Sequence, residues 1–167
     1  MNTEWSKIAE LIKNNNSELT HDGKSKFAIE LFLGKTWIKN TVDYIIELKT
    51  EWNLAVNCLR VLESEYATDY AYKIYKNSTN KDDRRIAVLV IKDIAHPKSI
   101  DWITEFLNDE NVADFGLGVL DQLLWTEKIK PNKMTESLLN LAAEKKNDGL
   151  SEKVEFIRKY LTKKSSC

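Results

Sequence analysis

The chain has 167 residues, of which 43% are hydrophobic and 31% are charged, and its formal net charge at pH 7 is −1. This length suits a single domain with a full core, and a net charge near zero excludes a global attraction to nucleic acid or to an anionic membrane. Five glycines and two prolines supply few turns for a many-stranded fold. We therefore expect residues 1–167 to form one all-α domain.

Two further features bear on the compartment. No apolar run reaches the roughly 18 residues that span a membrane, and the first residues lack the hydrophobic core of a signal peptide. Cys58 lies within an apolar helical pattern, whereas Cys167 is the last residue, so a disulfide is not expected. The sequence predicts a cytoplasmic protein in which Cys58 is a small core residue.

Apolar residues recur at helical spacing along the whole chain. The predicted helices are 3–13, 24–34, 36–49, 51–63, 66–76, two within 80–109, 112–125, 134–146 and 151–163. Most of the connections between them are short, so consecutive helices are expected to lie antiparallel. Ten helices then make about five hairpins.

Residues 80–109 contain the clearest hairpin. Asn80, Asp82 and Asp83 are suited to cap the first helix, and His96-Pro97 ends it because proline disfavours helical geometry in the residue before it. Proline also suits a first helical turn, so a second helix is expected from about Lys98. A lone hairpin of this size cannot bury both apolar faces, and it therefore requires neighbours of the same kind.

A shared register supports such neighbours. When the ten helices are paired from the N-terminus, the second helix of three pairs has a small residue followed by large apolar residues four and seven places later. These predicted core residues are Ala55, Leu59 and Leu62; Ala87, Ile91 and Ile94; and Gly116, Leu120 and Leu123. Ala28 and Phe32 fit only the first two positions, as expected of an outer unit. Gly116 and Gly118 cost helix stability, and close helix packing is the expected reason for both.

The segment DDRRIAVLVIKDI, residues 82–94, resembles the HEAT repeats and their bacterial relatives, the phycobilin-lyase-type HEAT-like repeats. In that family an aspartate in the turn and an arginine early in the second helix form ladders between units, which would correspond to Asp82 or Asp83 and Arg84 or Arg85. The next hairpin has Ala113-Asp114 where the arginine belongs. The resemblance covers roughly residues 24–146 and implies a right-handed α-solenoid that serves as a curved binding scaffold without chemistry of its own.

Catalytic patterns are sparse. The two histidines, His21 and His96, stand outside any cluster with metal-ligand spacing, and the sequence contains no phosphate-binding glycine loop. Asp93 could orient His96 for acid-base chemistry, but a histidine at a helix end more often complements the helix dipole. We therefore expect no catalytic residue, no metal, no cofactor and no enzymatic activity.

Aromatic residues and charge segregation suggest a binding surface. Residues 99–127 contain no lysine or arginine but carry Asp101, Glu105, Asp109, Glu110, Asp114, Asp121 and Glu127. This stretch predicts a basic protein partner attracted by Asp101, Glu105, Asp114 and Asp121. Trp125 and the tyrosines that include Tyr72 are the best aromatic anchors, because such side chains dominate binding hot spots. The other tryptophans are expected to pack in the core.

Three functions remain open at this point. The first is a non-enzymatic binding module, for example an immunity protein, which is an antitoxin that covers the basic cleft of a nuclease-like toxin. The second is a DNA-binding or DNA glycosylase-type enzyme built on HEAT-like repeats, which requires a basic surface that the acidic middle of this chain does not favour. The third is a generic scaffold or assembly factor. We expect a protein that is monomeric when free and that does not bind nucleic acid.

Overall fold

A computed structural model describes residues 24–145 and 148–164, and the predicted helix at 3–13 lies outside them. The described residues form helices joined by turns and contain no strand, which confirms the predicted all-α class. The elements are α2 (Lys24–Ile46), α3 (Trp52–Leu62), α4 (Glu65–Asn77), α5 (Lys81–Ile94), the 3₁₀ helix η1 (Pro97–Trp102), α6 (Ile103–Asn108), α7 (Ala113–Trp125), α8 (Lys133–Ala143) and α9 (Asp148–Lys164).

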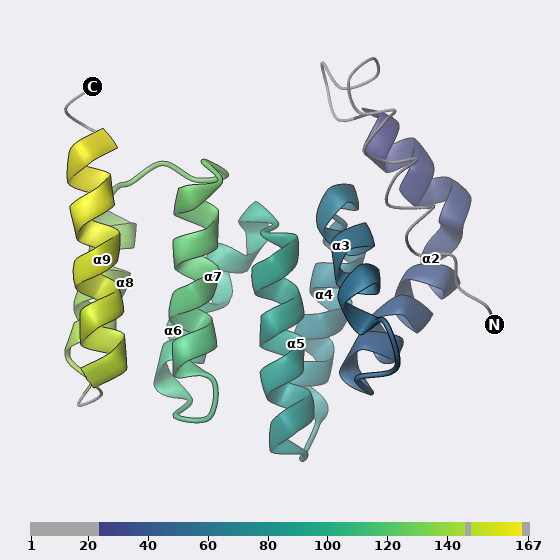
Figure 1. Cartoon of the computed structure of the whole chain (residues 1–167), viewed down its shortest axis with the longest axis horizontal. Helices are drawn as coiled ribbons and strands as arrows, with labels where there is room; N and C mark the ends of the chain where they lie inside the picture. Colours follow the sequence, from purple (N-terminus) through teal and green to yellow (C-terminus); the bar gives the residue numbers. More distant parts are fainter. Residues whose placement is uncertain (1–23, 146–147, 165–167) are drawn as a thin grey trace.

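The helices form two rows (Figure 1). In the view of Figure 1, α3, α5, α7 and α9 lie side by side in front, and α4, α6 and α8 lie behind them. The most extensive contacts join α4 to α5, α5 to α7, α2 to α3, and α6 to α7. The two rows thus contact each other, as α4 does with α5 and α6 with α7, and neighbouring front helices also contact one another. Among the described residues, no helix is long and apolar enough to cross a membrane.

The predicted core register is confirmed. Ala55, Ala87 and Gly116 are buried in the middle of their helices, and the residues four and seven places later are also buried. Burying a large aliphatic side chain contributes about 1.5 to 3 kcal/mol, so this repeated triplet is a principal source of stability for the two rows. Cys58 is buried as well, in agreement with its predicted role as a core residue.

Gly34 divides α2 into two arms, in agreement with the prediction that it ends one helix before another begins. Its φ of 77° and ψ of 156° lie in a region that is essentially restricted to glycine. A Cβ at this position would meet no atom within 4 Å, so the backbone conformation, and not a lack of space, requires the glycine. The bend turns residues 35–46 back along α3 and α4.

The second helix of the hairpin at 80–109 differs from the prediction. It begins as the 3₁₀ helix η1 and becomes α-helical only at Ile103. The backbone N–H and the hydroxyl of Ser99 both donate to the carbonyl oxygen of His96, at 3.0 and 2.8 Å. These bonds close a three-residue turn after His96-Pro97, which favours the tighter helix. The predicted cap Asn80 is confirmed, since its side chain accepts from the N–H of Asp82 at 2.9 Å.

The two glycines of α7 lie in different surroundings. A Cβ on Gly116 would lie 2.5 Å from the Cβ of Phe106, so α6 and α7 pack too closely for any side chain there. This confirms the predicted close packing. A Cβ on Gly118 would instead meet the flexible side chain of Lys92 at 3.2 Å and Nζ of Lys153 at 3.4 Å. Gly118 therefore faces lysine side chains and not a neighbouring backbone.

The outer helices depart from the apolar pattern in their sequences. In α2, Leu31 and Phe32 are 72% and 89% exposed, although Phe32 fits the core register. In α9, Val154 and Ile157 are buried, but Phe156 is 59% exposed. Within the described part of the chain, α2 and α9 each have helical neighbours on one side only, so part of each apolar stripe remains at the surface.

Candidate protein-binding surface

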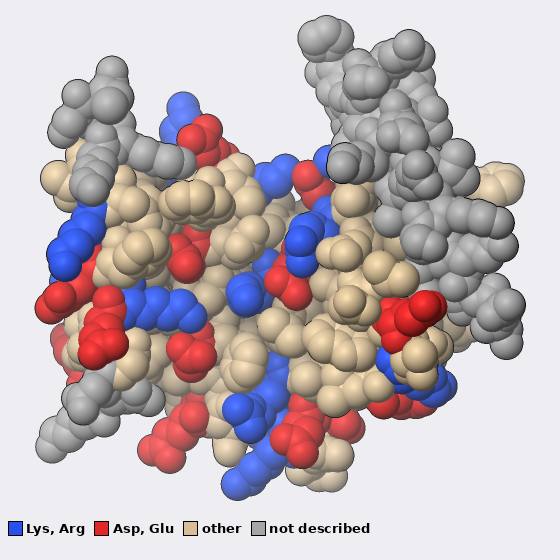
Figure 2. Space-filling view, viewed as in Figure 1, with Lys and Arg blue, Asp and Glu red and all other residues tan. Residues whose placement is uncertain are grey.

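The six predicted binding residues fall into two separate groups of three. Tyr72 and Glu105 contact each other where α4 meets α6, and Asp101 lies in the adjoining η1. Asp114, Asp121 and Trp125 all lie on α7 and face α9. The structure therefore does not join the four acids into one patch. On the face drawn in Figure 2, basic and acidic side chains are interspersed.

The first group belongs to a packed seam between α4 and α6. The ring of Tyr72 stacks on Trp102 with centroids 4.0 Å apart and an interplanar angle of 5°. Its hydroxyl donates to Glu105 at 2.6 Å, and Nζ of Lys76 also lies 2.6 Å from that carboxylate. Burial, with a further contribution from Glu105, raises the pKa of Tyr72 to about 12. The hydroxyl of Tyr72 and the ammonium of Lys76 thus both find their acceptor in Glu105, which is typical of a structural contact.

A second polar cluster continues this seam. The guanidinium of Arg84 in α5 pairs with the carboxylate of Asp109, which lies in the turn between α6 and α7. Tyr75 donates to the same carboxylate at 3.3 Å, and the backbone N–H of Asn111 donates to it at 3.1 Å. Burial opposes the ionisation of Asp109, but the bonds from Asn111 and the charge of Arg84 outweigh it and lower its pKa. This arginine-aspartate contact thus links α5 to the turn between α6 and α7. The other predicted residues pair differently: Asp83 accepts from Ser78 and Arg85 lies over Phe115.

The second group lies at the surface between α7 and α9. We call it the α7–α9 surface, and it consists of Asp114, Asp121, Trp125, Lys153, Phe156 and Tyr160. Trp125 is 58% exposed and Phe156 is 59% exposed. Both rings pack edge-on against Tyr160, with centroid distances of 5.5 and 5.8 Å. Three aromatic rings from two helices therefore form one exposed and internally supported cluster.

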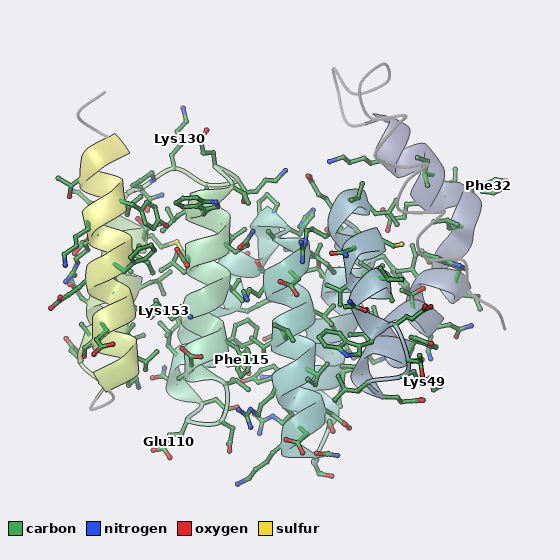
Figure 3. The ribbon with its side chains drawn as sticks, viewed as in Figure 1. Phe32, Lys49, Glu110, Phe115, Lys130 and Lys153 are labelled. Carbon is green, nitrogen blue, oxygen red and sulfur yellow. The ribbon has the colours of Figure 1, made fainter. Side chains whose placement is uncertain are left out.

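Hydrogen bonds fix this cluster in place. The hydroxyl of Tyr160 donates to Oδ1 of Asp121 at 3.0 Å, and burial together with the charge of Asp121 raises the pKa of Tyr160. Lys153 extends from α9 toward α7, where its Nζ lies 3.4 Å from Oδ1 of Asp114 (Figure 3). The Asp114 side chain is still 66% exposed. The surface thus combines a rigid aromatic end with a charged end.

The sequence interpretation missed three members of this surface. Lys153, Phe156 and Tyr160 were not among the residues predicted to bind a partner. Their four-residue spacing put Phe156 and Tyr160 on one helix face, but the exposure of that face depends on where α9 lies against α7. The structure agrees with the predictions for four of the tryptophans. Trp37, Trp52 and Trp102 are partly buried and pack against the core, whereas Trp125 is exposed.

Other candidate groups have structural roles. Nδ1 of His96 accepts from the backbone N–H of Lys98 at 3.3 Å, so this ring caps η1. The carboxylate of Asp93 lies 3.8 Å from the guanidinium of Arg60 on α3. Within residues 24–145 and 148–164, no group of three or more His, Cys, Asp or Glu side chains is arranged to hold a metal ion.

Comparison with known proteins gave no match to a family model, to a curated protein or to a solved structure.

Proposed function

We propose that this chain is a non-catalytic protein-binding module whose partner docks on the α7–α9 surface. The observation that carries the proposal is the pair of exposed rings, Trp125 and Phe156, held edge-on against Tyr160. Aromatic side chains that are already fixed lose little entropy on binding and bury a large area, so they are typical anchors of protein interfaces. Among the described tryptophans and phenylalanines, this is the cluster that combines exposure with mutual support.

We further propose that the hairpins form an α-solenoid with a right-handed superhelical curve. The two rows of helices and the buried triplet that repeats in α3, α5 and α7 support this arrangement. The link between Arg84 and Asp109, which joins α5 to the turn between α6 and α7, also supports it. In such an array the front helices present one continuous binding face.

For the partner, we propose a basic protein, of which a toxin covered by its immunity protein is one example. Support comes from Asp114, whose side chain is largely exposed, and from Asp121, which lies one turn from Trp125. Acids beside an aromatic anchor would orient an approaching basic surface. The pairing of Asp114 with Lys153 reduces this attraction, so we assign most of the binding energy to the rings.

The test begins with isolation of the partner by co-purification with the full chain, followed by binding measurements on the purified pair. Replacing an interface anchor typically costs 2 kcal/mol or more, so Trp125→Ala and Phe156→Ala should each weaken binding by roughly 30-fold, mainly through faster dissociation. Phe32→Ala is the matched control, because Phe32 is 89% exposed but lies on α2. Equal affinities for Trp125→Ala, Phe156→Ala and wild type would reject the α7–α9 surface, and tight binding of duplex DNA would reject the protein-binding role.

A further inference from the structure

A pocket of about 340 Å³ lies on the inner side of the bend at Gly34. Leu31 from the first arm of α2, Ile38 from the second arm and Tyr66 from α4 form its apolar walls. The volume is at the lower end of the range for sites that hold a small ligand or a single side chain. We call it the Gly34 pocket. Helix α2, which forms one side of the pocket, lies at the other end of the molecule from α9 (Figure 1).

Carboxylates line the pocket beside this apolar wall. Glu65 and Asp69 lie in the first two turns of α4, and both contact Nζ of Lys98, at 3.0 and 2.8 Å. Glu30 accepts a bond of 2.6 Å from the hydroxyl of Ser64, a neutral donor. The carboxylates of Glu65 and Asp69 remain 59% and 43% exposed, so one lysine does not enclose them.

The pocket already places a cation against an aromatic face. Nζ of Lys35, an exposed side chain in the pocket wall, lies 5.4 Å from the centre of the Tyr66 ring. Among the described residues, the ammonium groups of Lys35 and Lys98 lie with three carboxylates, those of Glu30, Glu65 and Asp69, which leaves one negative charge. A ligand with one positive charge and an apolar stem would therefore neutralise the pocket, cover Leu31 and take the place of Lys35 over the ring.

We infer that the Gly34 pocket binds an arginine side chain, presented by the basic partner proposed above. The three methylene groups pack on the exposed side chain of Leu31, and the guanidinium lies on Tyr66 within reach of Glu65 and Asp69. Arginine fits better than lysine because its planar guanidinium stacks on an aromatic ring and bonds carboxylates in pairs. This inference rests on the proposed function for the source of the arginine, but the pocket can be tested alone.

The probe is N-acetyl-arginine amide, and its matched control is N-acetyl-citrulline amide, which has nearly the same shape without the charge. Each is titrated into the ¹⁵N-labelled full chain while the backbone amide signals are followed. The arginine probe should give saturable shifts at Leu31, Lys35 and Tyr66, with a dissociation constant on the order of millimolar for so small a ligand. The citrulline probe should bind at least about tenfold more weakly. No saturable shift with arginine, or equal binding of both probes, would overturn the inference.

Variants test the assigned groups. The double variant Glu65→Gln with Asp69→Asn should weaken arginine binding by about tenfold, because both charged acceptors are lost. Its control is Glu152→Gln with Glu155→Gln, which removes two exposed acids from α9 and should leave the titration unchanged. Circular dichroism checks that each variant remains helical. Unchanged arginine affinity in the pocket variant would contradict the role given to these carboxylates.

The proposal for the Gly34 pocket and the proposal for the α7–α9 surface can be tested separately. Trp125→Ala should bind the arginine probe as wild type does, so a failure of the proposed docking surface would leave the titration intact. Conversely, a pocket variant that loses the probe but binds the isolated partner with wild-type affinity would show that the partner does not use the Gly34 pocket. We expect the pocket variant to bind the partner at least about tenfold more weakly, in addition to its loss of affinity for the arginine probe.

Discussion

The hydroxyl of Tyr160 in α9 donates a hydrogen bond of 3.0 Å to Oδ1 of Asp121 in α7. This bond crosses between two neighbouring helices and orients the ring against which Trp125 packs. Asp121 therefore contributes both negative charge and a position for Tyr160. Lysine at this site would remove both contributions, whereas asparagine keeps an acceptor for the hydroxyl and removes only the charge.

The first prediction uses this distinction to test the charge of the partner. Association of wild type with a basic partner should be fast at low salt and should slow by roughly tenfold or more as ionic strength rises, because salt screens Asp114 and Asp121. Asp114→Asn with Asp121→Asn should flatten that dependence while keeping the fold. Stopped-flow association rates over a salt series measure both effects. Identical salt dependence of the two proteins would exclude these acids as the source of the attraction.

The second prediction compares the two glycines of α7. Gly116→Ala should lower the free energy of unfolding by about 1 to 3 kcal/mol, because the new methyl group would overlap Cβ of Phe106. Gly118→Ala meets the movable side chain of Lys92 and gains helix propensity, so stability should stay unchanged or rise by up to about 1 kcal/mol. Urea denaturation measures both variants. A reversed order of stability would mean that α6 and α7 are packed differently.

The third prediction concerns the core register. Ile91 is fully buried in α5, so Ile91→Ala should cost about 2 to 5 kcal/mol of unfolding free energy. Met134→Ala, at a partly exposed position on α8, should change stability by less than about 0.5 kcal/mol. The measurement is again urea denaturation at constant pH. A neutral Ile91→Ala would show that α5 turns a different face toward α4 and α7.

The fourth prediction concerns alkaline pH. The pKa of Tyr72 is raised from 10.0 to about 12 in the folded protein, mainly by burial and then by its bond to Glu105. Above pH 10 the unfolded chain releases this proton first, so the folded state loses stability as pH rises from 10 to 12. Tyr72→Phe should make that decline shallower, which denaturation curves at several pH values would reveal. Parallel declines in both proteins would assign the alkaline sensitivity to other groups.

Much of the helical organisation could be read from local pattern. The spacing of Ala87, Ile91 and Ile94 sets one face of a helix whatever lies opposite, and the structure buries that face. The end of a helix at Gly34 and the cap at Asn80 also depend on neighbouring residues alone. Even so, the sequence did not predict that η1 precedes α6, because the 3₁₀ turn depends on the detailed hydrogen bonds that follow His96.

The predicted binding residues show most clearly which properties follow from the sequence and which depend on the tertiary structure. The sequence by itself determined which residue types are present and which helix carries each, and it singled out Trp125 for exposure. Only the tertiary structure decided that Glu105 lies beside Tyr72, whereas Asp121 faces Tyr160. The reason is physical: helical periodicity fixes the direction of a side chain relative to its own helix, but its partner depends on which helix packs alongside. Charge pairing across helices is therefore settled by packing and not by the order of residues along the chain.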